Sequence, residues 1–237
     1  MLTVVCLGGG EIGRLGVQSS LREGARVLLV DPDEGCMARS LCNRSVDDAD
    51  RLLDAAAGDV LYMRGDGTVV LADLIHRWVP DQVVPAAPGH LAARLAMEWY
   101  RRHDRELHPF GGPLLRAVAA LPAGIVQLID STQGVMVTSY MPSGKSCCPE
   151  CDRPPVCPVT GKERLAPMHR LVDAALAGAV DRRSVLVTVG EEVGILHGDD
   201  LKGTLDMLDD AADGATMGIA TSCGCHAIVN LFRHEVH

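Results

Sequence analysis

A glycine-rich turn between two apolar runs constrains the fold of this chain more than any other feature. Residues 2–7 (LTVVCL) have the composition of a buried strand, and the turn Gly8–Gly13 (GGGEIG) opens a helical stretch. Residues 25–30 (ARVLLV) then form a second apolar run that ends at Asp31. Strand, glycine turn, helix and strand in this order predict an α/β fold with a parallel sheet.

The same turn has the G-x-G-x-x-G pattern of a dinucleotide site. Gly8 would permit the tight turn, Gly10 would let a phosphate approach the backbone, and Gly13 would let the helix pack closely on the sheet. The N–H groups of the helix N-terminus would bind the pyrophosphate. Asp31 would accept hydrogen bonds from ribose hydroxyls, which favours NAD over NADP. The alternative is that the glycines only form a turn and bind no ligand.

Two segments of this region, VVCLGGGEIGRLG and GARVLLVDPD, carry a family resemblance. Together they resemble the N-terminal Rossmann unit of TrkA-type regulatory domains and of precorrin-2 dehydrogenases, which implies a nicotinamide dinucleotide as the ligand. They are equally similar to the opening domain of ATP-grasp carboxylases, which need not hold a dinucleotide there. No ATP-grasp domain follows, and the cysteine-rich second half resembles neither group.

The chain is predicted to form two domains. Helical and strand patterns alternate up to residue 107, and a segment rich in proline and glycine follows over residues 107–124. We therefore expect a Rossmann-like domain over residues 1–107 and a smaller α+β cysteine-rich domain over residues 125–237. The elements expected before the boundary are helices over 47–57, 70–79 and 90–105 and strands over 59–64 and 82–86. Those expected after it are strands over 125–130, 135–141, 184–189, 216–221 and 227–232 and helices over 165–180 and 201–212.

Seven residues in the second half are candidate metal ligands. They fall in a proline-rich loop, residues 146–161, and in a C-terminal turn, residues 223–226: Cys147, Cys148, Cys151, Cys157, Cys223, Cys225 and His226. The spacing Cys148-x2-Cys151 lets two thiolates converge on one ion. The adjacent Cys147 and Cys148 leave a turn in different directions, so we expect a ligand from the C-terminal turn to complete the site.

The identity of the metal stays open between iron–sulfur and zinc. Cysteines followed by proline at mixed spacings suit an iron–sulfur cluster. The segment Cys148-Pro-Glu-Cys151 suits a zinc knuckle, but the glycine that usually frees N–H groups to bond the sulfurs is missing after Cys151. A third reading is a set of free or redox-active thiols, including a Cys223–Cys225 pair.

Composition limits the classes of partner. The 237 residues are 47% hydrophobic with a net charge of −9, which argues against a nucleic-acid partner. The chain shows no bilayer-spanning apolar run and no basic leader, which predicts a cytoplasmic protein without a membrane partner. Nine cysteines in a reducing compartment indicate metal or redox chemistry rather than disulfides. The expected partner is a small-molecule nucleotide, and a homodimer is allowed.

These patterns favour an NAD(P)-linked redox protein or oxidoreductase with a cysteine-ligated Fe–S or zinc centre. The alternative is a non-catalytic, nucleotide-sensing regulatory protein with a structural zinc site. A small non-redox enzyme that uses the metal as a Lewis acid is a third possibility. The sequence leaves open whether the chain is an enzyme and names no substrate. His169 is expected on the exposed side of its helix.

Overall fold

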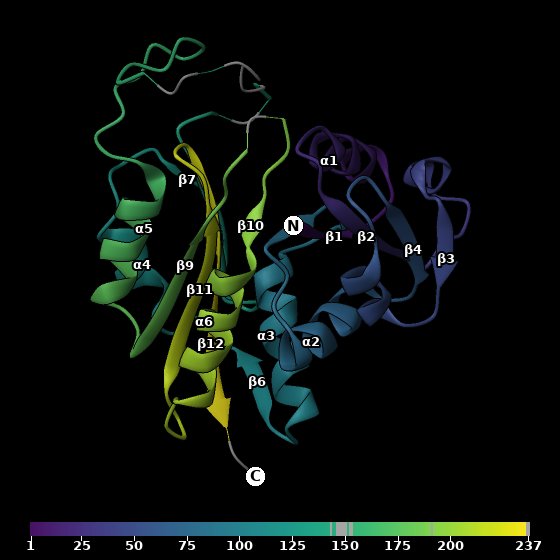
Figure 1. Cartoon of the computed structure of the whole chain (residues 1–237). Coiled ribbons are helices and arrows are strands. Elements are labelled where there is room, and N and C mark those ends of the chain that lie inside the picture. Colours follow the sequence, from purple (N-terminus) through teal and green to yellow (C-terminus); the bar gives the residue numbers. More distant parts are fainter. Residues whose placement is uncertain (143, 146–150, 152–153, 191, 236–237) are drawn as a thin grey trace. The chain divides into compact units, whose positions relative to one another are not determined.

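The computed structural model of the chain describes residues 1–142, 144–145, 151, 154–190 and 192–235 (Figure 1). They form two compact units. Unit 1 comprises Met1–Trp99 and Val189–Gly203, and unit 2 comprises Tyr100–Thr188 and Thr204–His237. Each unit contains a sheet, and parallel and antiparallel strand pairs both occur, so the chain is a mixed α/β protein.

Unit 1 is built on a sheet with the strand order β10-β5-β1-β2-β4-β3. Its parallel strands are β1 (Thr3–Leu7), β2 (Arg26–Asp31), β3 (Arg44–Val46), β4 (Val60–Arg64) and β5 (Gln82–Pro85). The strand β10 (Leu196–His197) pairs with β5 in the antiparallel sense. The helices are α1 (Glu11–Arg22), α2 (Gly67–Arg77) and α3 (Leu91–Arg102), whose last turn belongs to unit 2, with 3-10 helices η1 (Met37–Leu41) and η2 (Ala49–Asp54).

Local sequence explains how the elements of unit 1 pack. Every residue of β1 is buried, as expected for a parallel strand covered on both faces. Gly16 allows the helix α1 to lie close to β5. A Cβ atom at this position would stand only 2.6 Å from Val84 Cγ1. The helix α2 begins after Asp66, whose carboxylate accepts the N–H groups of Thr68 and Val69 at 2.8 and 3.2 Å.

The structure differs from the sequence-based expectation in two places in unit 1. The helix expected over residues 47–57 is the shorter 3-10 helix η2, whose start is held because Arg77 forms ion pairs with Asp48 and Asp50. Residues 189–203 were expected in the second domain, but they belong to unit 1, where Leu196 pairs with Val83.

Unit 2 is built on a sheet with the strand order β7-β8-β12-β11-β9, and β6 also pairs with β12. Its strands are β6 (Glu106–Pro109), β7 (Val126–Asp130), β8 (Val135–Ser139), β9 (Arg182–Val187), β11 (Thr216–Ser222) and β12 (His226–Glu235). The pair β9–β11 is parallel and the other pairs are antiparallel. The helices are α4 (Leu114–Ala119), α5 (Met168–Ala177) and α6 (Gly198–Asp209), and α6 begins in unit 1 and ends in unit 2.

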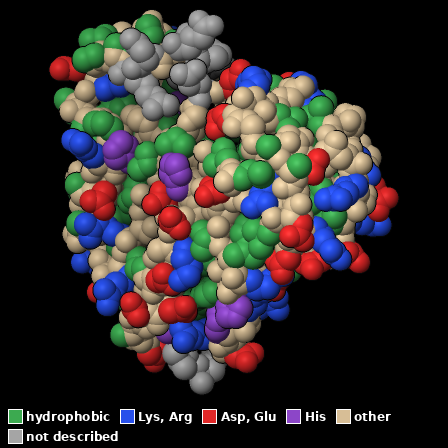
Figure 2. All heavy atoms as spheres, viewed as in Figure 1, with side chains coloured by type: hydrophobic (Ala, Val, Ile, Leu, Met, Phe, Trp, Pro, Cys, Tyr) green, Lys and Arg blue, Asp and Glu red, His purple; other side chains and the backbone are tan. Residues whose placement is uncertain are grey.

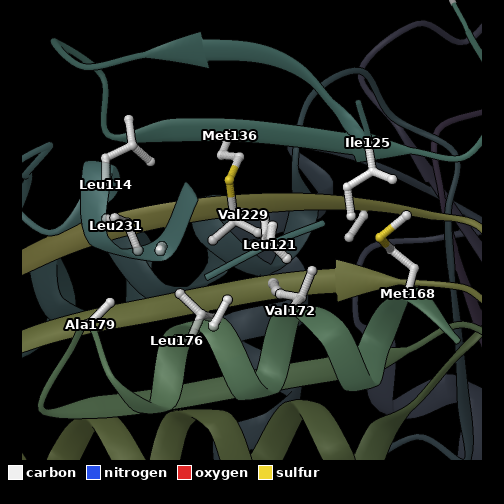
Figure 3. Packing of buried hydrophobic residues seen from close by; sticks show 14 of the residues in the cluster. Leu114, Leu121, Ile125, Met136, Met168, Val172, Leu176, Ala179, Val229 and Leu231 are labelled. Atoms are coloured by element: carbon white, nitrogen blue, oxygen red, sulfur yellow. The ribbon is translucent and has the colours of Figure 1, made fainter. Parts of the chain in front are cut away.

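The core of unit 2 lies between α5 and the sheet (Figure 3). Val172 and Leu176 of α5 pack in one buried cluster with Val229 and Leu231 of β12. The first turn of α5 is also tied to the β11–β12 turn, because the Met168 N–H donates to the Gly224 carbonyl at 2.9 Å. This packing brings the segment before α5 next to the C-terminal cysteine turn.

The surface carries charges of both signs. Acidic and basic side chains are intermixed on the face shown in Figure 2. A binding site on this face therefore takes its charge from individual side chains rather than from a broad field of one sign. Among the helices in the described part of the chain, none has the length and apolar character needed to cross a membrane.

Candidate functional site

The glycine turn lies at the carboxyl end of β1 and leads directly into α1. Gly8 has a φ of +105°, and a Cβ atom there would stand 2.8 Å from the backbone of Ala86, just after β5. A Cβ atom at Gly13 would overlap the Gly8 carbonyl oxygen. Gly10 differs, because its Cβ would have no neighbour within 4 Å and no side chain caps the helix that it precedes. Gly8 and Gly13 therefore shape the turn, and Gly10 leaves the start of α1 open.

Asp31 lies beside this turn. Its Oδ2 accepts the Gly9 N–H at 2.6 Å, and its Oδ1 accepts the Asp33 N–H at 2.8 Å. Each carboxylate oxygen can accept a second hydrogen bond, so Asp31 keeps capacity for ribose hydroxyls. Sequence reasoning missed Cys36, whose sulfur would overlap a Cβ atom at Gly9 and therefore packs on the turn. A lone cysteine after a strand carries no pattern that could have predicted this contact.

Gly13→Ala should destabilise the protein, whereas Gly10→Ser should leave its stability unchanged or slightly raised. Helix propensity favours alanine by only about 1 kcal/mol, and overlap with the fixed Gly8 carbonyl should cost about 3 kcal/mol or more. Serine at position 10 meets open space and can cap α1. Urea unfolding of both variants measures the difference. Equal midpoints for the two variants would show that Gly13 is not a packing residue.

The C-terminal cysteine turn stabilises one thiolate. Cys223 Sγ accepts the N–H groups of Cys225 and His226 at 3.4 and 3.3 Å and lies 3.5 Å from His226 Nδ1. Desolvation raises the pKa of Cys223, but these hydrogen bonds outweigh it and lower the pKa from 9.0 to about 7. Cys223 and His226 also line a pocket of about 310 Å³, so the sulfur can be reached by a small reagent.

The proline-rich loop contains a second stabilised thiolate. The Thr160 hydroxyl and the N–H groups of Thr160 and Val159 bond to Cys157 and lower its pKa from 9.0 to about 7. Residues 157–162 close as a tight turn, in which the Gly161 N–H donates to the Cys157 carbonyl at 2.8 Å. Cys157 and Cys223 thus share one arrangement, in which N–H groups two and three residues later bond the sulfur. Cys223 is directly followed by Gly224, whereas Cys157 is followed by Pro158, so the arrangement does not require a glycine directly after the cysteine.

Arg164 connects the two cysteine groups. Its Nη2 donates to Cys151 Sγ at 3.6 Å, it also bonds to Cys157, and its charge interacts with Cys225. Sequence reasoning missed this residue, because a single arginine in a loop belongs to no motif. Cys147 and Cys148 lie outside the described residues. Within residues that the structure does describe, no three Cys, His, Asp or Glu side chains are arranged to hold a metal ion.

His169 also differs from expectation. It was predicted on the exposed side of α5, but it is half-buried, and its Nδ1 is buried without a hydrogen-bond partner in the described part of the chain. The physical reason is that α5 begins at Met168, so His169 lies in the first turn, against the loop that precedes the helix. All seven cysteines that the structure describes are free of disulfides.

In metal-free protein, the alkylation rate of Cys223 should rise with pH around a midpoint of about 7. Cys6 should stay unreactive, since it is fully buried and burial raises its pKa. The thiolate of Cys223 adds stability that is complete above the unfolded pKa of 9.0 and is lost as pH falls through about 7. Iodoacetamide labelling followed by peptide mass spectrometry measures the midpoint. His226→Phe should move it upward, and an unchanged midpoint would exclude the imidazole as its cause.

Comparisons with known proteins place the second half in a family. A family model described as "Uncharacterized protein, C-terminal domain" (AF_1314_C) matches residues 92–235. An "Uncharacterized protein" of Archaeoglobus fulgidus is 26% identical over 230 residues, which cover 97% of this chain and 98% of that protein. The solved N5-carboxyaminoimidazole synthetase from Staphylococcus aureus, complexed with ADP, is similar at 12% identity and a TM-score of 0.24, over 97% of this chain and 46% of that one. A TM-score this low does not establish a shared fold. Because the family model matches more than half of the sequence, the chain belongs to the AF_1314_C family.

Proposed function

We propose that this protein is an NAD(P)-linked redox protein. Unit 1 binds the dinucleotide, and the cysteines of unit 2 form an Fe–S or zinc centre. The observation that carries the nucleotide part is the start of α1, which has no side-chain cap and follows Gly10, with open space where a Cβ would be. Backbone N–H groups in such a position bind pyrophosphate. A cytoplasmic location, a homodimer and the absence of nucleic-acid and membrane partners remain parts of the same proposal.

The strand order of unit 1 supports a Rossmann-like arrangement. The order β4-β2-β1-β5 runs outward from β1 in both directions, so the sheet changes winding direction between β1 and β5. Open α/β sheets bind ligands at the carboxyl ends of the strands at such a point. The contact between Gly8 and the backbone of Ala86, just after β5, puts the glycine turn next to this point.

The redox part rests on the thiols of unit 2. Cys157 and Cys223 both have a pKa lowered to about 7, which makes each a good metal ligand or redox thiol near neutral pH. Arg164 contacts Cys151 and Cys157 and supplies a positive charge to sulfurs from both groups. The complete ligand set would add Cys225, His226 and the undescribed Cys147 and Cys148.

A non-catalytic nucleotide sensor with a structural zinc site is the second candidate. The observation that favours it is the shared arrangement at Cys157 and Cys223, where two backbone N–H groups bond one sulfur. Such turns hold thiolates rigidly, which suits a structural site with four fixed ligands. Anaerobic purification separates the two candidates: a brown protein supports an iron–sulfur cluster, and a colourless protein with stoichiometric zinc supports the sensor.

Isothermal titration with NADH, NADPH and ATP tests the nucleotide proposal. NADH should bind at least about tenfold more tightly than NADPH, since the Asp31 carboxylate would repel a 2′-phosphate. Asp31→Asn should narrow this gap while keeping an oxygen that can accept the Gly9 N–H. The exposed neighbour Asp33 offers a matched control, and Asp33→Asn should leave the gap unchanged. If none of the three nucleotides binds, the nucleotide proposal is wrong. If the wild type binds NADH and NADPH with equal affinity, Asp31 is not part of the site.

A further inference from the structure

Unit 2 contains a pocket of about 390 Å³ beside the start of α5. Its walls are mostly apolar, with Pro155, Leu165, Pro167 and Val187 among them, and Gly224 of the β11–β12 turn also lines it. Small-molecule sites commonly enclose about 300–1,000 Å³, so this pocket has room for a small ligand.

Among the residues that the structure describes, the polar side chains lining the pocket are Arg164 and His169, with no aspartate or glutamate among them. Both carry unsatisfied groups: Arg164 Nε and Nη1 and His169 Nδ1 are buried and have no hydrogen-bond partner in the described part of the chain. Buried donors without acceptors cost free energy, and a charged donor costs more than a neutral one. An acceptor that entered the pocket would remove this cost.

Arg164 has most of its donors left for such an acceptor. It bonds to Cys151 through Nη2 and also to Cys157, whereas Nε and Nη1, with three hydrogens between them, have no partner among the described residues. A hydrogen bond between a guanidinium and a carboxylate is charge-assisted, and such bonds are strongest where water is excluded. One guanidinium also matches the single negative charge of a carboxylate better than the higher charge of a phosphate.

We propose that this pocket binds the carboxylate of a small organic acid with an apolar body, through Arg164 and His169. The apolar body would lie against Pro155, Leu165 and Val187. This site goes beyond the proposed function, because it depends only on residues of unit 2 and requires neither the nucleotide nor the metal. Gly224 lies between Cys223 and Cys225, so a bound acid would also lie next to the candidate thiol centre.

Titration of the full-length protein with hexanoate, followed by NMR of labelled amides, tests this proposal. Hexanoate should shift the amide signals of Gly224 and Leu165 in a saturable way. Hexanol, which has the same apolar chain without the charge, should bind at least about tenfold more weakly, as expected for loss of a charged hydrogen-bonded pair. Equal binding of hexanol, or tighter binding of inorganic phosphate, would overturn the carboxylate assignment.

Variants test the residues. Arg164→Gln should weaken hexanoate binding by about tenfold or more, while Arg170→Gln, at an exposed arginine in the first turn of α5, should change it less than about twofold. His169→Ala provides a second test if Arg164→Gln does not fold, and it should weaken binding several-fold. Unchanged affinity in the folded Arg164 variant, or in His169→Ala if the former is unfolded, would overturn the assignment. So would an equal loss in the Arg170 control.

Discussion

Gly10→Val should weaken NADH binding by more than about a hundredfold and leave the protein folded. Position 10 has a φ of −69°, which any L-residue adopts, and its Cβ would meet no atom within 4 Å. Valine is a poorer N-cap than glycine, so a stability loss of about 1 kcal/mol is expected. Its methyl groups would fill the space through which a pyrophosphate reaches the N–H groups of α1, and losing those charged hydrogen bonds should cost about 3 kcal/mol of binding.

Isothermal titration with NADH and urea unfolding separate the two effects of this variant. Gly203→Val is the matched control, because Gly203 is exposed, belongs to unit 1 and also has open space at its Cβ position. The control should bind NADH like the wild type. If Gly10→Val also binds NADH with unchanged affinity, the glycine turn serves only the fold, and the dinucleotide proposal loses its main support.

The elements of the fold were largely predictable where a local pattern reports burial. The run LTVVCL contains a strand, β1, because an unbroken apolar run suits a strand covered on both faces. Leu91, Leu95 and Trp99 recur at helical spacing and are all buried in α3. These patterns involve only residues that are close together in the sequence, so the strand and the helix can be predicted without knowledge of the fold.

The return of Val189–Gly203 to unit 1 could not be predicted in this way. The strand β10 has two residues, Leu196 and His197, and two residues show no periodicity. Its position depends on pairing with Val83 and Gln82, more than a hundred residues earlier in the chain. Pairing over such a separation follows from the whole fold rather than from a local pattern.

The same difference separates the two candidate sites: some of their residues belong to a sequence motif, and others are brought together only by the fold. The packing roles of Gly8 and Gly13 follow from a motif with a known geometry, and the structure gives both residues close backbone neighbours. Arg164 was not predictable, because its contacts with Cys151 and Cys157 arise from the fold of the loop, where Val156 pairs with Glu163. The relation between the cysteine groups likewise depends on the Met168–Gly224 hydrogen bond, which no spacing in the sequence reveals.

Cys151→Ser and Cys225→Ser should each lower the bound metal and the melting temperature together. Arg164 donates to Cys151 Sγ and also interacts electrostatically with Cys225, so one side chain relates the two cysteines in unit 2. We expect one metal site that takes ligands from both groups. Metal binding energy is then folding energy, and losing a tightly bound metal should lower the melting temperature by roughly 10 °C or more.

Elemental analysis and thermal unfolding of the same preparations measure both quantities. Cys42→Ser is the control, because Cys42 belongs to unit 1 and is not a candidate ligand, so this variant should retain full metal content. One alternative result would place all metal ligands in a single cysteine group. If Cys225→Ser keeps its metal and stability while Cys151→Ser loses both, the ligands all belong to the proline-rich loop. The Cys223–His226 turn would then act without a metal, and its thiolate, with a pKa of about 7, would be the first group to test for redox cycling with Cys225.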